Sequence, residues 1–93
     1  MLIGHVLRHH VLYVTLHHEL DVTTRAAAAL QIQTLVQAHR PARVVLALPG
    51  ADPTPATLSA LARTRRLCAS LHVPLVLTGA SARTRRLLEA TGE

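Results

Sequence analysis

The sequence predicts a single α/β domain with the element order β-β-α-β-α-β-α. Short aliphatic runs rich in Val, Leu and Ile alternate with segments of strong helix formers, and prolines or glycines stand at most of the boundaries between them. A chain of 93 residues is long enough for one domain only. Because strands that alternate with helices need crossover connections, we expect a mixed, mostly parallel sheet of about four strands over residues 1–93.

The first half of the chain predicts a β-hairpin followed by a helix. The apolar runs 2–7 and 11–17 are separated only by a short polar segment, which is typical of antiparallel strands. Residues 24–40 contain strong helix formers, and Pro41 ends the helix. Side-chain oxygens before this helix are expected to cap its start, and its buried stripe is expected to have a spacing of three and four residues. The capping residues are Asp21, Thr23 and Thr24, with Glu19 at the same strand and helix junction, and the stripe is Ala28, Ala29, Ile32, Leu35 and Val36.

The second half predicts two strand and helix pairs. Residues 43–48 are nearly continuously apolar, as in a strand that is covered on both faces. A helix is expected from about residue 57 to 71, with Thr57 as its cap. A strand over 74–78 follows, in which Pro74 is tolerated as the first residue, and a last helix covers 81–91.

Composition limits the classes of function. There is no Phe or Trp and one Tyr, so the core must be aliphatic, and the formal net charge of +5 favours acidic partners. Cys68 is the only cysteine, which indicates a reducing compartment. No apolar run reaches the length of a membrane span, so we expect a cytoplasmic protein without membrane insertion.

One hexapeptide, Ala-Arg-Thr-Arg-Arg-Leu, occurs at residues 62–67 and again at 82–87. On a helical wheel Arg63 and Arg66 lie on the polar side with Ser70, whereas Arg65 falls within the apolar sector. The apolar sectors of the two helices are expected to be Leu58, Leu61, Ala62, Cys68 and Ala69 in the first and Thr84, Leu87 and Leu88 in the second. The arginines fit solvated helix faces, a protein-docking surface or weak phosphate binding. A chain with one aromatic residue lacks the stacking platforms of a specific single-strand binder.

The histidines predict no metal centre. Adjacent histidines of an extended strand point to opposite faces, and there is neither a second cysteine nor a His-Glu-x-x-His motif. The seven are His5, His9, His10, His17, His18, His39 and His72. No base and nucleophile pair is visible either, so we expect no cofactor and no enzymatic activity.

Three segments make the chain resemble the STAS domain, the fold of bacterial anti-sigma factor antagonists. They are the tetrapeptide His-Glu-Leu-Asp at 18–21, where the family usually has Gly-Glu-Leu-Asp, the strand Val-Val-Leu-Ala-Leu at 44–48, and Leu-Leu-Glu-Ala-Thr-Gly at 87–92. The resemblance covers nearly the whole chain, and the family's last strand and helix would follow Glu93. It implies a regulator that binds a protein partner, with a homodimer as a further option.

The resemblance also implies a docking surface and one departure from the family. The loop before the second long helix, and that helix, would contact an anti-sigma factor with kinase activity. In this chain the implied surface is Asp52, Thr54, Ala56, Thr57, Leu58, Arg63 and Arg66. Where phosphorylated members carry Asp-Ser-Ser-Gly or Asp-Ser-Thr-Gly, this chain has Pro55 and Ala56, so Thr57 and Thr54 are the only substitute phosphoacceptors nearby. The alternative function is a subunit that scaffolds or regulates a larger assembly, such as a transport ATPase or a stress-signalling complex.

Overall fold

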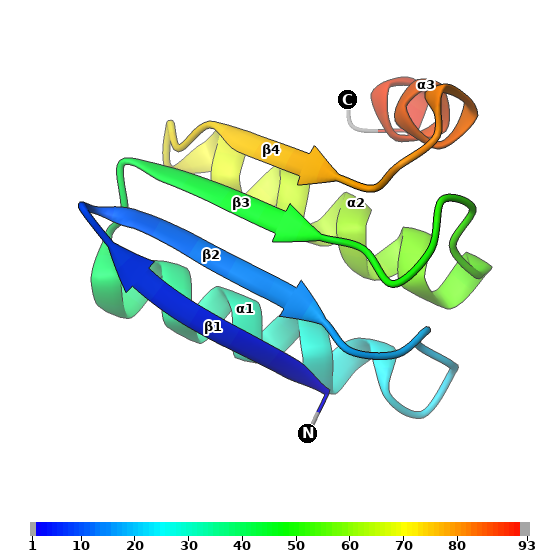
Figure 1. Ribbon diagram of the computed structural model, residues 1–93, viewed down its shortest axis with the longest axis horizontal. Coiled ribbons are helices and arrows are strands. Elements are labelled where there is room, and N and C mark those ends of the chain that lie inside the picture. The colour runs from blue at the N-terminus through cyan, green and yellow to red at the C-terminus, as the bar shows by residue number, and fades with distance from the viewer. Residues whose placement is uncertain (1, 92–93) are drawn as a thin grey trace.

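Four strands form one mixed sheet in a computed structural model that describes residues 2–91 (Figure 1). The spatial order is β1-β2-β3-β4; β1 runs antiparallel to β2, and β2, β3 and β4 are parallel to one another. The strands are β1 (Ile3–Arg8), β2 (Val11–Leu16), β3 (Arg43–Ala47) and β4 (Leu75–Thr78). Gly92, the end of the C-terminal motif, and Glu93 lie outside the described residues.

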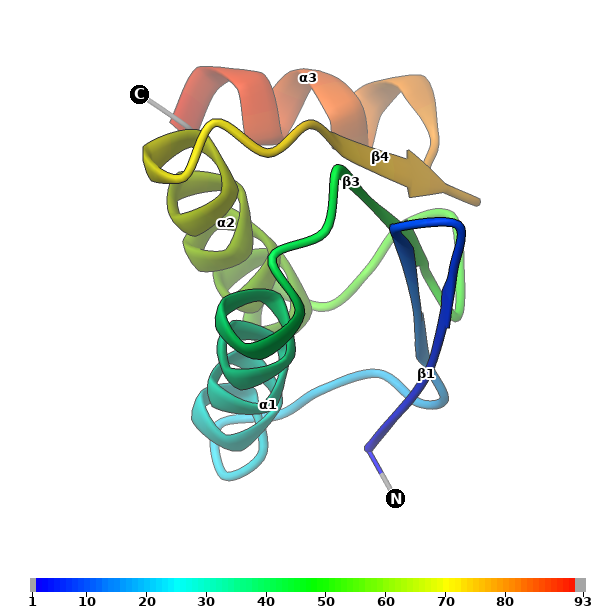
Figure 2. The ribbon, with the colours of Figure 1, turned by 90° about the vertical axis from the view of Figure 1, so that its left-hand side faces the viewer.

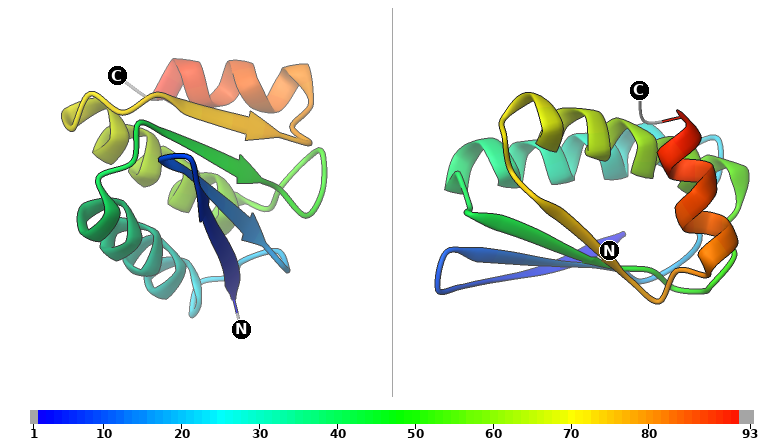
Figure 3. Two further views of the ribbon diagram at one scale, coloured as in Figure 1. Left: turned by 60° about the vertical axis from the view of Figure 1, so that its left-hand side comes forward. Right: turned by 90° about the horizontal axis from the view of Figure 1, so that it is seen from above.

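Three helices complete the predicted element order. Helices α1 and α2 lie side by side on one face of the sheet, and α3 lies beyond β4 (Figures 2 and 3). Their bounds are α1 (Arg25–His39), α2 (Pro55–Ser70) and α3 (Ala82–Thr91). In the described part of the chain, no helix combines the length and the hydropathy that crossing a bilayer requires.

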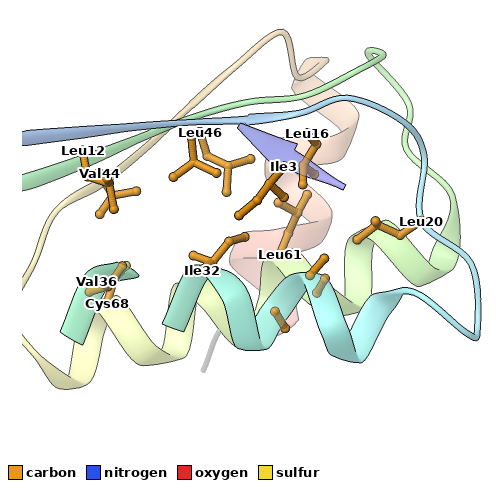
Figure 4. Packing of buried hydrophobic residues seen from close by; sticks show 14 of the residues in the cluster. Ile3, Leu12, Leu16, Leu20, Ile32, Val36, Val44, Leu46, Leu61 and Cys68 are labelled. Atoms are coloured by element: carbon orange, nitrogen blue, oxygen red, sulfur yellow. The ribbon is translucent and has the colours of Figure 1, made fainter. Parts of the chain in front are cut away.

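The core is aliphatic and lies between the sheet and the two helices. Side chains of β2 and β3 point down onto α1 and α2 in the close view (Figure 4). The largest side chains with an exposed fraction below 2% come from four elements, β2, α1, β3 and α2: Leu12, Val14, Ile32, Val36, Val44, Leu46, Thr57, Leu61 and Cys68. Burial raises the pKa of the Cys68 thiol, so this group behaves as a small apolar side chain.

The expectation that residues 43–48 are covered on both faces is wrong. Val44 and Leu46 are fully buried against the helices, whereas Val45 and Ala47 on the opposite face are only half-buried. Both crossovers return on the same side of the sheet, so the sheet has one covered and one uncovered face. Its apolar run therefore continues on a side that no described element covers.

Helix α2 begins at a different residue than the sequence predicts, and some side chains of α2 and α3 face a different direction than the helical wheels predict. Helix α2 starts at Pro55, a favourable first position, and its cap is Thr54 in place of the predicted Thr57. Its buried stripe is Ala56, Thr57, Ala60, Leu61, Thr64 and Cys68. Ala69 and Leu87, which were expected to face inward, are exposed. The small residues of this stripe face inward because α2 packs on both the sheet and α1. Small side chains at this contact allow the backbones to approach each other.

The hairpin turn between β1 and β2 holds two histidines in the left-handed region. His9 has a φ of 53° and His10 a φ of 63°, as a two-residue type I′ turn requires. Asn and Gly are the residues that adopt this conformation at low cost. The turn is therefore strained locally, although the ladder beside it pairs from Arg8 with Val11 to Ile3 with Leu16.

We predict that the double substitution His9→Asn and His10→Gly stabilises the protein by about 1–2 kcal/mol, because it removes two unfavourable left-handed residues. Urea unfolding followed by circular dichroism measures the change. The matched control is His17→Asn with His18→Gly, outside the hairpin turn. A gain that is no larger in the turn variant than in the control would contradict the prediction.

Candidate functional site

The candidate site lies at the carboxyl edge of the three parallel strands. The loops after β2, β3 and β4, residues 17–24, 48–54 and 79–81, leave the sheet at this edge, on the right in Figure 1. In open α/β sheets this is the edge where binding sites are formed. Hydrogen bonds join the middle loop to both of its neighbours, so the three loops form one surface.

The carboxylate of Glu19 binds the start of α2. Glu19 Oε1 accepts a hydrogen bond from the backbone N–H of Thr54 and another from the hydroxyl of Thr57, both at 2.9 Å. A negative charge at a helix N-terminus is favourable because the macrodipole is positive there. Glu19 therefore occupies the place where an external anion would bind this helix.

The main chain of Leu20 is held by the same two threonines. Its N–H donates to Thr57 Oγ1, and its carbonyl oxygen accepts from Thr54 Oγ1, each at 2.8 Å. The Leu20 side chain is buried in the core. We call Glu19, Leu20, Thr54 and Thr57 the threonine clamp, since it fixes the loop after β2 to the start of α2.

Both threonine hydroxyls of the clamp donate their hydrogen to an acceptor within the clamp. Each threonine hydroxyl has one hydrogen; that of Thr57 goes to Glu19, and that of Thr54 goes to the Leu20 carbonyl. The two hydroxyl oxygens are also 3.0 Å apart, so a bond between them would take a hydrogen away from one of these acceptors. Thr54 Oγ1 additionally accepts from the Thr57 N–H at 3.2 Å, which caps α2.

A second set of bonds fastens Asp52 and its loop to the start of α3. Ser81 Oγ donates to Asp52 Oδ1 at 2.9 Å and accepts from the Thr84 N–H at 3.1 Å, so Ser81 caps α3. Thr84 Oγ1 donates to the carbonyl oxygen of Ala51 at 2.9 Å. Asp52 is exposed, yet one of its oxygens already has a partner within the chain.

Asp21 organises the turn before α1 but does not cap the helix itself. Its Oδ1 accepts from the backbone N–H groups of Thr23 and Thr24, both at 2.9 Å, and from their hydroxyls. The bond from the Thr23 hydroxyl makes the largest contribution to lowering the pKa of Asp21 below its usual 3.8. Helix α1 begins later, at Arg25, and its N-cap Thr24 makes no side-chain cap bond.

The predicted docking residues separate into an inward and an outward group. Ala56 and Thr57 are buried, and Leu58 is half-buried, so little of these three is available to a partner. Arg63 and Arg66 are exposed on the outer side of α2, as expected. Sequence reasoning missed Ser81 and the hydrogen bonds of Thr84, and it expected Glu19, like Asp21, only to cap a helix at the strand and helix junction.

The two copies of the hexapeptide adopt equivalent roles. Their threonines, Thr64 and Thr84, are both buried, with exposed fractions of 3% and 2%. Their middle arginines, Arg65 and Arg85, line one groove of about 420 Å³ between α2, β4 and α3. Arg85 Nη2 also donates to the Leu77 carbonyl oxygen of β4 at 2.7 Å. The matching sequences therefore reflect two helices that pack inward through the same threonine.

Residues 2–91 show no buried side-chain nitrogen or oxygen that lacks a hydrogen bond and no group of three or more His, Cys, Asp or Glu side chains that could hold a metal ion. No model of a known protein family matches the chain, and no curated protein matches its sequence. The threonine clamp and the exposed arginines of α2 are therefore the features from which a function can be inferred.

We predict that Thr57→Val destabilises the protein by about 1–3 kcal/mol, because it leaves the buried N–H of Leu20 without an acceptor. Thr64→Val is the matched control: the residue is equally buried, but its hydroxyl binds only the Ala60 carbonyl, 2.9 Å away in the same helix. Urea unfolding should show a smaller loss for the control. Equal losses would mean that the clamp contributes nothing specific.

We predict that the stability difference between the natural protein and Asp21→Asn shrinks as the pH falls. A carboxyl whose pKa is lowered by folding stabilises the native state above its unfolded pKa, near 3.8, and this contribution is lost as the pH falls through the folded value. Denaturation midpoints between pH 7 and pH 2 measure it. A difference that is constant with pH would exclude a charge effect at Asp21.

Proposed function

We propose that this chain is a non-enzymatic regulator of the anti-sigma factor antagonist type, which binds a protein partner through the outer side of α2 and the loop before it. The observation that carries the proposal is the threonine clamp. It holds the start of α2 in one position, so the surface beside it is preorganised for binding. Preorganisation favours a protein-docking role because less conformational entropy is lost on association.

The same clamp supports binding that phosphorylation does not switch in the way usual for the STAS family. The hydroxyl of Thr57 is fully buried and donates to the Glu19 carboxylate. A phosphate there would place about −1.5 to −2 charges next to that carboxylate, where like charges repel. Thr54 is half-buried, and its hydroxyl is engaged with Leu20. Neither threonine therefore presents a free hydroxyl at the surface.

The exposed arginines of α2 supply the chemistry for recognising a partner. Arg63 and Arg66 lie three residues apart, so they project from one side of the helix. Arginine can bind a carboxylate with two parallel hydrogen bonds and is enriched among the residues that dominate protein interfaces. Carboxylates of a partner are therefore the expected contacts of this surface.

Capture from the native cytoplasm followed by mass spectrometry should identify the partner, and titration calorimetry of the purified pair then tests the surface. We predict that Arg63→Ala together with Arg66→Ala weakens binding by about 2 kcal/mol or more if either arginine is a dominant contact. Fold stability should change little, because both side chains are exposed.

The control is Arg83→Ala with Arg86→Ala, which changes the equivalent positions of the second hexapeptide copy on α3. Both residues are exposed, and the substitution leaves Arg85 and its bond to β4 in place. A larger loss of binding for the control than for the α2 variant would show that the docking surface lies on α3 and not on α2. Equal affinity of all three proteins would reject the arginine surface.

A further inference from the structure

No described helix or strand covers the face of the sheet that points away from the helices, and only the His17 ring lies close to it, at Gly4 of β1. Figure 2 shows α1 and α2 on one side of the sheet and no described element on the other. Because residues alternate between faces along a strand, the pairing register defines which side chains lie there. We call this surface the open face: Gly4, Val6, Arg8, Val11, Tyr13, Thr15, Arg43, Val45, Ala47, Val76 and Thr78.

An apolar row crosses the open face at its middle. Val6 pairs with Tyr13, Tyr13 with Val45, and Val45 with Val76, so the row continues through every strand. The exposed fractions of Val6, Tyr13 and Val76 are 51%, 43% and 41%, and Val45 is half-buried. These three are among the seven large apolar side chains that are exposed in the described chain. These three form a continuous apolar row with Val45, whereas the other four, Leu7, Val22, Leu30 and Leu87, lie elsewhere on the surface.

Tyr13 is the only Phe, Tyr or Trp residue of the protein, and it is not used in the core. It lies at the middle of the open face, on a strand that has neighbours on both sides. A large ring gains most when it is removed from water, and tyrosine is enriched at the centre of protein interfaces because it combines an apolar ring with a hydroxyl. Its position on the surface points to a binding role.

The open face is also basic at one end and carries no carboxylate. Arg8 and Arg43 flank Val11 in the row next to the apolar one. None of the four strands contains Asp or Glu. The acidic residues nearest in sequence, Glu19 and Asp52, lie in the loops beyond the opposite end of the parallel strands. A partner that complements this face must therefore bring apolar side chains together with carboxylates.

A second copy of the chain does not fit these requirements. A second copy would present the same face without Asp or Glu, so it offers no carboxylate to pair with Arg8 and Arg43. Two copies in parallel would bring Arg8 and Arg43 against each other. Two antiparallel copies would place them on the uncharged row of Gly4, Thr15, Ala47 and Thr78.

We propose that the open face binds a single amphipathic helix of a partner protein. A helix of about 12 residues is ~18 Å long, which matches the width of four strands spaced ~4.8 Å apart, so one helix that crosses the strands covers the narrow apolar row. Its apolar side chains lie on Tyr13, Val45 and the residues beside them. Its carboxylates lie along the side that faces the neighbouring row of Arg8 and Arg43. This site is separate from the α2 surface and does not depend on it.

The test uses a display library of helical 18-residue peptides without Tyr or Trp, selected on the whole protein. Because Tyr13 is the only fluorescent side chain, its emission reports directly on occupation of the open face. Selected peptides are expected to be amphipathic and rich in Asp or Glu, and to change the Tyr13 emission saturably. A selection that yields no binder, or binders without carboxylates, overturns the proposal.

Two double variants place the site and keep the Tyr13 reporter. Val45→Thr with Val76→Thr retains β-branched residues, and Arg8→Glu with Arg43→Glu reverses the charge; each is expected to weaken a selected peptide at least about tenfold. The controls are Val22→Thr, at an exposed valine before α1, and Arg63→Glu with Arg66→Glu on α2. They should change affinity less than about twofold, provided circular dichroism shows an intact fold for all four proteins.

Three further results overturn the inference. One is an equal loss of peptide affinity in the α2 control. Another is a concentration-dependent dimer in sedimentation that Val45→Thr with Val76→Thr dissociates, which would assign the face to a second copy. The third is saturable binding of duplex RNA or of anionic vesicles with the same Tyr13 response, which would assign it to phosphate groups.

Discussion

The hydrogen bonds between Glu19, Leu20 and the two threonines at the start of α2 are the constraint on which this carboxyl edge depends. The loop after β2 must leave the sheet toward α1, while the loop after β3 must lead into α2. The clamp joins the two loops by hydrogen bonds. The Glu19 carboxylate and the Leu20 main chain of the first loop bind the two threonine hydroxyls and the Thr54 N–H at the start of α2. The charge of Glu19 also complements the dipole of α2, so one side chain both positions the helix and stabilises its first turn.

The packing of the helices follows from the small residues of their inner faces. Ala28 and Ala29 of α1, and Ala56 and Ala60 of α2, are buried. The core contains no Phe or Trp, so the space between the helices and the sheet is shallow and small side chains fill it. The buried threonines Thr64 and Thr84 donate to backbone carbonyls, so burial costs them little. This arrangement explains why one hexapeptide serves two helices. Its threonine faces inward, its middle arginine lines the groove beside β4, and its outer arginines remain at the surface.

Two surfaces of different chemistry result from this architecture. The outer side of α2 is basic and polar and lies next to a rigid loop, whereas the open face is apolar in its middle and basic at one end. The outer side of α2 is suited to pairing with carboxylates at the periphery of an interface. The second, with Tyr13 at its centre, suits burial of an apolar strip. Because the sheet and α2 itself lie between the two surfaces, occupation of one leaves the other accessible.

The sequence by itself determined the order of the elements, the aliphatic core and the exposure of Arg63 and Arg66, because strand and helix periodicity are local properties that survive without tertiary context. It also located Glu19 and Asp21 at a strand and helix junction. Only the tertiary structure decided that Glu19 binds Thr57, 38 residues away, that Thr54 caps α2, and that Ser81 binds Asp52. Such pairs depend on which loops meet at one edge. The open face could not be predicted from the sequence either. A nearly continuous apolar strand has the same sequence pattern whether one or both of its faces are covered. The fold decides between these cases, because α1 and α2 both lie on the same side of the sheet.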